Sequence, residues 1–236
     1  MADKEKTRDI RMLINQFRTS EHWAVSLARD LLLVVAVVGS IALALFLICG
    51  TWPAVVTIES GSMIPHMNIG DLVVVVQKDR YGAFETWADG NATTPQKFQE
   101  YGDVIIYKPN GMTTVNPIIH RAIQYVDISP VTEIKGETLN GNYTPLHPGY
   151  ITWGDNNPVP DQLSRYPGIG AIEPVKEEWI VGKALFTVPV VGYLPLNIIP
   201  VVIIVIIILV LYELYLRRNE REMPTKSPKR RGKNQR

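Results

Sequence analysis

Cysteine is nearly absent from this chain of 236 residues, since Cys49 is the only one. An internal disulfide is therefore excluded. The chain also lacks the His-x-x-x-His and Cys-x-x-Cys spacings typical of metal ligands, and it has no phosphate-binding glycine loop. We consequently expect neither a metal ion nor a cofactor.

Charged residues are missing from two long stretches, 31–58 and 184–212. Each is longer than the ~20 apolar residues that cross a bilayer. We therefore expect transmembrane segments at 31–52 and 188–216. Buried core helices are the alternative, although such helices rarely run so far without a charge. A cleaved signal peptide is disfavoured for the first stretch, because it begins late and lacks a convincing small-residue cleavage site.

Basic residues are concentrated at the two ends of the chain. Residues 1–30 hold six Lys/Arg and five acids, residues 213–236 hold nine and three, and residues 59–183 hold nine and fifteen. Because Lys and Arg beside a span favour the cytoplasmic side, we expect both termini in the cytoplasm and the middle segment across the membrane. This predicts a multi-pass protein of the cell membrane with an extracytoplasmic domain.

The two terminal segments have different patterns. Apolar residues within 1–30 recur at steps of three and four, which predicts an amphipathic helix on the membrane surface or, alternatively, a partner-binding helix. The tail at 217–236 is basic and interrupted by proline. A nucleic-acid contact is one interpretation of such a tail. An orientation signal that contacts anionic lipid is simpler, so nucleic acid is not an expected partner.

The middle segment, 53–187, is long enough for one domain. Short β-branched apolar runs are separated there by Gly, Pro, Asn and Asp, which predicts strands joined by turns. The runs are 55–58, 72–76, 104–107, 118–119 and 180–181. The polar stretch 81–101 is predicted to be an inserted loop. Two N-glycosylation sequons, at Asn91 and Asn142, fall in this segment and are compatible with its translocation.

A candidate nucleophile follows the first predicted span, in the stretch Ser60-Gly61-Ser62-Met63-Ile64-Pro65. A serine hydroxyl needs a neighbouring base and donors that stabilise an oxyanion. Gly61 permits a tight turn that would expose the Ser62 hydroxyl, and the Ser62 N–H with the Ser60 hydroxyl could form an oxyanion hole. The alternative is that this Ser-Gly-Ser is only a turn.

Four histidines are candidates for the base. His22 precedes the first span on the cytoplasmic side, His66 is too close to Ser62 in the sequence, and His147 lies in a proline-rich loop. His120 follows the apolar pair 118–119, as a residue at the end of a strand facing a cleft would. A purely structural role for His120 remains the alternative.

Two aspartates could orient such an imidazole. Asp155 and Asp161 flank a turn-rich segment, and either could reach inward. A structural role remains open for Asp155, whose carboxylate could cap backbone amides in its turn.

Taken together, the motifs resemble those of type I signal peptidases, in the order found in that family. The blocks run from Ile58 to Pro65, Gly70 to Val73, Gly102 to Tyr107, Ile119 to Arg121 and Gly154 to Val159. The ordered set covers most of the middle segment. Histidine at position 120 is similar to the archaeal and endoplasmic-reticulum subtype, since bacterial members mostly have lysine there.

The resemblance implies a mainly β catalytic domain of coiled antiparallel sheets with transmembrane helices at both ends. It also implies a serine endopeptidase that removes signal peptides from secreted preproteins after small residues at the outer membrane face. The nucleophile falls on Ser62, the base on His120 and the acid on Asp161, with Asp155 as a supporting or alternative acid. Substrate contacts are implied for Ile58, Glu59, Ser60, Gly61, Met63, Pro65, Ile118 and Ile119. Implied partners are preproteins, membrane lipid and the protein-translocation machinery.

Three other functions remain open at this point. The chain could be a related membrane protease with few clients, a catalytically silent relative that serves as an assembly subunit, or a β-rich sensor with a membrane anchor. The silent relative is disfavoured because Ser62, His120 and both aspartates are present. The sensor leaves the ordered motifs unexplained.

Overall fold

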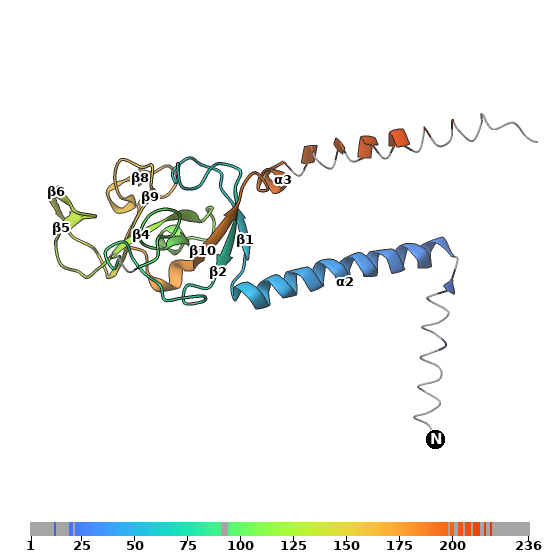
Figure 1. Ribbon diagram of the computed structural model, residues 1–236, viewed down its shortest axis with the longest axis horizontal. Helices are drawn as coiled ribbons and strands as arrows, with labels where there is room; N and C mark the ends of the chain where they lie inside the picture. Colours follow the sequence, from blue (N-terminus) through green and yellow to red (C-terminus); the bar gives the residue numbers. More distant parts are fainter. Residues whose placement is uncertain are drawn as a thin grey trace, which may run out of the picture.

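The computed structural model describes residues 12, 19–20, 22–90 and 94–197, together with separate positions between 199 and 218. The sequon at Asn91, most of the predicted amphipathic helix at 1–30 and nearly all of the tail at 217–236 lie outside the described residues. Within the described part, a β-rich domain follows a long helix (Figure 1).

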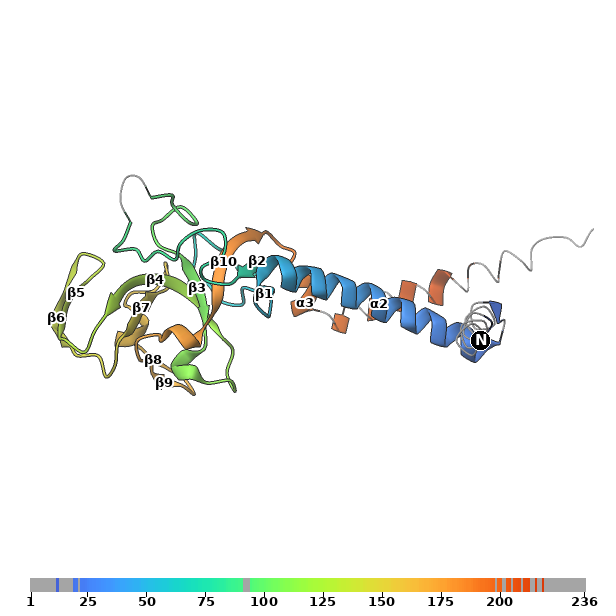
Figure 2. The same ribbon diagram turned by 90° about the horizontal axis from the view of Figure 1, so that it is seen from below.

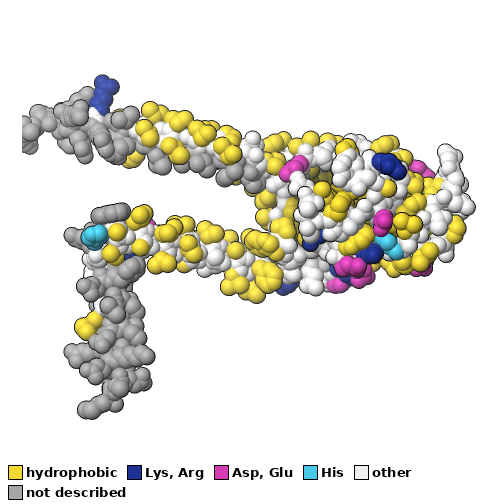
Figure 3. All heavy atoms as spheres, turned by 180° about the vertical axis from the view of Figure 1, so that it is seen from behind, with side chains coloured by type: hydrophobic (Ala, Val, Ile, Leu, Met, Phe, Trp, Pro, Cys, Tyr) yellow, Lys and Arg dark blue, Asp and Glu magenta, His cyan; other side chains and the backbone are white. Residues whose placement is uncertain are grey.

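Helix α2, Trp23–Cys49, begins before the predicted span 31–52 and ends three residues before its predicted end. The ring of His22 accepts a hydrogen bond from the Ala24 N–H (3.3 Å), and Gly50 ends the helix in a left-handed conformation with φ 71°. In the described part of the chain, α2 is the one helix long and apolar enough to cross a membrane. Leucines such as Leu31 are more than half exposed, so α2 is not a core helix of this domain (Figure 3).

The second predicted span, 188–216, stays a prediction. Helix α3, Tyr193–Leu196, is short, and beyond Asn197 only separate positions are described. Helices α2 and α3 leave the domain at the same end in two perpendicular views, while the hairpin β5–β6 lies at the opposite end (Figures 1 and 2). This arrangement is compatible with a membrane at the α2 end.

The main sheet has six antiparallel strands in the order β1-β2-β10-β3-β4-β7. They are β1 (Val55–Thr57), β2 (Leu72–Val76), β10 (Ile180–Val188), β3 (Val104–Tyr107), β4 (Ile118–Val126) and β7 (Gly149–Trp153). Two hairpins are separate from it, β5 (Val131–Ile134) with β6 (Glu137–Tyr143), and β8 (Arg165–Tyr166) with β9 (Gly170–Ala171). Short 3-10 turns are η1 (Pro109–Gly111), η2 (Asp161–Leu163) and η3 (Glu177–Trp179). The prediction of a mainly β, antiparallel domain behind an apolar helix is confirmed.

Each predicted apolar run lies in or overlaps a strand of the main sheet, but β4 continues to Val126 rather than stopping after 119. Strand β6 escaped prediction because its side chains are polar and largely exposed. The predicted loop at 81–101 contains turns and one isolated bridge between Lys97 and Glu100, with no helix or longer strand in its described positions.

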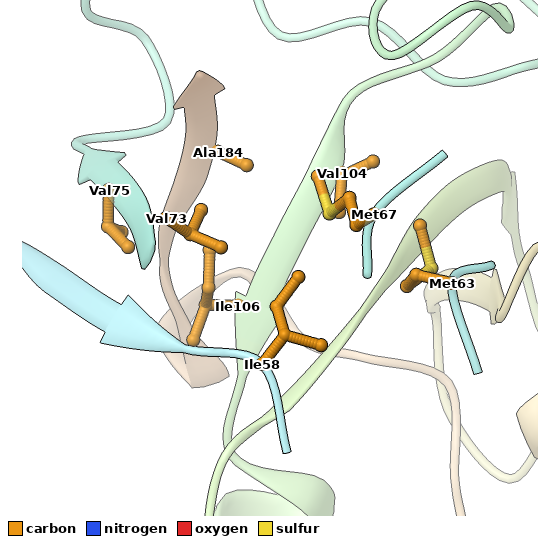
Figure 4. Packing of buried hydrophobic residues seen from close by; sticks show 8 residues of the cluster. All are labelled: Ile58, Met63, Met67, Val73, Val75, Val104, Ile106 and Ala184. Atoms are coloured by element: carbon orange, nitrogen blue, oxygen red, sulfur yellow. The ribbon is translucent and has the colours of Figure 1, made fainter. Parts of the chain in front are cut away.

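One face of the sheet holds the apolar cluster that fixes the segment after β1. Met63 and Met67 are almost fully buried and pack with Ile58 against residues of β2, β3 and β10 (Figure 4). The turn that carries Ser62 is therefore attached to the core by the side chain immediately following it. At the base of α2, Cys49 is buried with Ala54 and Val76.

Candidate active site

Ser62 and His120 line the same cavity, which has a volume of about 940 Å³. Strand β1 and the residues after it contribute one part of the lining, and residues 116–120 contribute another. Tyr166 and Leu196 also line the cavity. Most of its wall is apolar, which suits an uncharged peptide segment rather than a charged metabolite.

Asn156, in the 154–157 turn, holds the turn around Ser62 by two hydrogen bonds. The Asn156 backbone N–H donates to the Ser62 carbonyl (2.8 Å), and its side-chain amide donates to the Gly61 carbonyl (3.0 Å). The hydroxyl oxygens of Ser60 and Ser62 are 3.2 Å apart. Two carbonyls of the turn are thus fixed, while the Ser62 side chain stays at the cavity surface.

His120 is the third residue of β4, opposite Ile105 of β3, rather than the last residue of a strand as the sequence suggested. Its side chain is only 3% exposed, and Nδ1 lies 2.6 Å from Asp161 Oδ2. An ionised carboxylate can only accept, so Nδ1 carries the proton and Nε2 is left as the basic nitrogen. The pair is a histidine oriented by a buried acid.

Asp161 is fully buried and accepts hydrogen bonds at both carboxylate oxygens. Oδ2 accepts from the hydroxyls of Tyr107 (2.8 Å) and Thr152 (2.7 Å) in addition to His120, and Oδ1 accepts from Tyr166 (2.7 Å). Burial raises the pKa of Asp161, but attraction to His120 and the hydrogen bonds lower it by more than burial raises it. The net pKa is below its usual range. The carboxylate is therefore ionised at neutral pH.

The hydroxyl donors to Asp161 were not found by sequence reasoning. Strand pairing places Tyr107 and Thr152 on the same sheet face as His120. Residues two apart on a strand share a face, and His120 is paired with Ile105, so Tyr107 lies on this face. By the same rule Ala122 shares the face of His120, and Thr152 is paired with Ala122. A known register would have revealed this grouping, whereas the sequence alone does not show which strands pair.

Asp155 lies in a different set of contacts. Its oxygens accept from Arg121 Nε (2.8 Å) and Arg121 Nη2 (2.6 Å), and its Oδ2 is 2.7 Å from His66 Nδ1. Arg121 is fully buried, and its Nη1 also donates to the Lys97 and Gly102 carbonyls. Burial raises the pKa of Asp155, but Arg121 and then His66 lower it to a net value below the usual range. This ion pair joins β4, the 154–157 turn and the end of the 81–101 loop.

The other predicted site residues are distributed as follows. Seven predicted substrate contacts line the cavity, namely Ile58, Glu59, Ser60, Gly61, Met63, Ile118 and Ile119. Ile58 and Met63 offer little surface to an occupant, since both are nearly buried. Pro65 is exposed and is not part of the lining. The sequon residue Asn142 is exposed on β6.

The two remaining histidines have other neighbours. His147 Nε2 lies 2.9 Å from a Glu173 carboxylate oxygen, and His22 caps α2. Within the residues that the structure describes, no group of three or more His, Cys, Asp or Glu side chains could hold a metal ion.

Gly154 lies where the segments of this site approach most closely. A Cβ at this position would be 2.7 Å from His120 Nε2 and 2.8 Å from the Ser62 carbonyl oxygen. Gly154→Ala is therefore expected to push the imidazole away from the serine turn, and a displacement of about 1 Å costs roughly 10²-fold in rate. A cleavage assay measures the loss. Gly168→Ala is the control in an open position, although its positive φ makes a small stability loss expected there.

No protein-family model matches the chain. Among curated proteins, the signal peptidase complex catalytic subunit SEC11 of Schizophyllum commune is 32% identical over 148 residues, which is 62% of this chain and 65% of that protein. Over these residues the chain is similar in sequence to a signal peptidase subunit. This confirms the resemblance found in the sequence motifs. Because the chain spans somewhat less than two thirds of the length of SEC11, its own activity, substrates and partners are matters of proposal.

Proposed function

We propose that this chain is a membrane-bound serine endopeptidase that cleaves signal peptides from secreted preproteins after small residues. The main support is the juxtaposition of Ser62 and His120 on one cavity, with His120 bonded to the buried carboxylate of Asp161. The similarity to SEC11 supports the same conclusion independently of the geometry.

In the proposed reaction, the Ser62 hydroxyl attacks the scissile carbonyl while His120 Nε2 accepts its proton. The Ser62 N–H and the Ser60 hydroxyl stabilise the oxyanion. His120 then returns the proton to the leaving amine, and water hydrolyses the acyl-enzyme. Asp161 stays ionised throughout and stabilises the imidazolium. Asp155 supports the site through Arg121 and does not contact His120 in this scheme.

The substrate is proposed to bind as an added strand. Strand β1 is at the edge of the main sheet and lines the cavity, so its outer edge is available for pairing. The signal segment would lie in the bilayer beside α2, with its cleavage region in the cavity. Both termini would be cytoplasmic and the domain extracytoplasmic, with lipid, preprotein and the translocation machinery as partners. The relative's name supports partners within a complex.

The test is cleavage of a preprotein by the full chain, in the membranes in which it is expressed and after purification in detergent. The substrate carries small residues at the first and third positions before the cut, and a matched preprotein carries bulky residues there. We expect the first to be cut at the predicted bond and the second to remain intact, as read by mass spectrometry. Cleavage only in membranes would identify a need for lipid or a partner subunit. A folded chain that cuts neither in either setting would overturn the proposal and favour the silent relative.

A further inference from the structure

Among the donors to Asp161, Tyr166 has a distinct position. Tyr107 and Thr152 are buried behind the carboxylate, but Tyr166 is half-buried and its side chain lines the cavity. His120 is the other donor that reaches the cavity. Besides His120, Tyr166 therefore contacts both the proposed triad acid and the space assigned to the substrate.

The two oxygens of Asp161 are unequally supported. Oδ2 accepts from three side chains, whereas Oδ1 accepts from Tyr166 at 2.7 Å, the one donor that the hydrogen bonds of the described residues give it. Bonds at both oxygens restrain rotation of the carboxylate about its Cβ–Cγ bond. Removing the bond to Oδ1 would leave this restraint to the donors at Oδ2 alone and loosen the alignment of Oδ2 with His120.

Tyr166 is positioned by a 3-10 turn and a short hairpin. The 3-10 turn η2 begins at Asp161, and β8 follows it, where Tyr166 pairs with Gly170 of β9. The ring also packs beside the cluster that contains Tyr107 and Ile172. Burial and the nearby Asp161 raise the pKa of Tyr166 above its ordinary value of 10, so the hydroxyl remains a donor at any physiological pH.

We propose that Tyr166 is a positioning residue for the Ser62–His120–Asp161 set, acting through Asp161 Oδ1, and that its ring is a wall of the substrate cavity. The proposal rests on the proposed peptidase function. Tyr166 would thus have two separable roles. Its hydroxyl orients the carboxylate of Asp161, and its ring shapes the space for the peptide. Loss of the hydroxyl should therefore change kcat, and loss of the ring should also change KM.

The experiment compares Tyr166→Phe and Tyr166→Leu in the full-length chain with the wild type, using the preprotein assay. Tyr166→Phe should lower kcat about ten-fold with KM within about two-fold, which corresponds to one lost bond to a charged acceptor. Tyr166→Leu should lower kcat similarly and raise KM as well. Tyr150→Phe is the matched control, since that tyrosine is bonded to Glu177 and does not line the cavity. Thermal unfolding is recorded for each variant.

A second comparison asks whether Tyr166 acts through Asp161. Tyr166→Phe is introduced into an Asp161→Ala chain, and the slow residual cleavage is followed in single-turnover reactions. We expect no further loss, because the bonded partner is gone. An unchanged kcat for Tyr166→Phe, or an equal loss with and without Asp161, would overturn the proposal. A wild-type chain that fails to cleave would instead count against the peptidase function itself.

Discussion

Replacing Ser62 by alanine is expected to reduce preprotein cleavage by roughly 10⁴-fold or more, because no other group would form the acyl-enzyme. The change removes a hydroxyl that lies 3.2 Å from the Ser60 hydroxyl. Met63 and the bonds from Asn156 to the turn are unaffected. The variant should thus insert and fold like the wild type, and rates measured beside an unfolding curve check both statements.

Ser60→Ala is the matched control for this result. It removes a proposed oxyanion donor but leaves the nucleophile, so a loss of about 10²- to 10³-fold is expected rather than complete inactivation. A Ser62→Ala chain that still cleaves at an appreciable fraction of the wild-type rate would rule out Ser62 as the nucleophile. Equal losses in the two variants would assign Ser60 and Ser62 comparable roles.

The two aspartates should respond in opposite ways to replacement by asparagine. Asp161→Asn keeps the size of the side chain but removes the charge that stabilises the imidazolium on His120. A fall of roughly 10⁴-fold in kcat is expected, with a stability loss of about 1–3 kcal/mol because a buried acceptor becomes a donor. Asp155→Asn removes the carboxylate that neutralises the fully buried Arg121, and such a loss costs about 3–5 kcal/mol of stability. The part of that variant that remains folded should still cleave.

Denaturant unfolding and cleavage at low temperature separate these effects. His66→Ala provides a further control, since it removes the second partner of Asp155 but leaves Arg121 in place. Its activity should stay within about ten-fold of the wild type. If Asp155→Asn abolished cleavage in demonstrably folded protein while Asp161→Asn retained it, the two acids would exchange roles.

Much of the architecture could be predicted because the relevant signals are local. The absence of charge between residues 31 and 58 indicated an apolar helix, and the β-branched runs indicated most strands of the main sheet. Ser62 was predicted as the nucleophile from its glycine-flanked turn and from the ordered motifs. His120 was preferred over the other histidines and was assigned as the base by the resemblance, but its position inside β4 was not predicted.

What escaped prediction depends on contacts between distant segments. Arg121 bonds to carbonyls about 20 residues earlier and to a carboxylate 34 residues later, which no local pattern specifies. The choice between Asp155 and Asp161 could not be derived from the residues, because both flank the same turn-rich segment. The structure distinguishes them by their partners, Arg121 and His66 for one and His120 for the other. Tyr166 was missed because the strands that position it, β8 and β9, are each only two residues long and leave no pattern in the sequence.

The burial of Cys49 makes this chain convenient for site-specific labelling. Its side chain is 1% exposed and packs between Ala54 and Val76, so maleimide reagents have little access to it in the folded protein. A cysteine introduced at the exposed Asn140 of the β5–β6 hairpin would then be the single accessible thiol. A fluorophore or spin label attached there would report the distance of the hairpin from lipid-borne quenchers, without first deleting a native thiol.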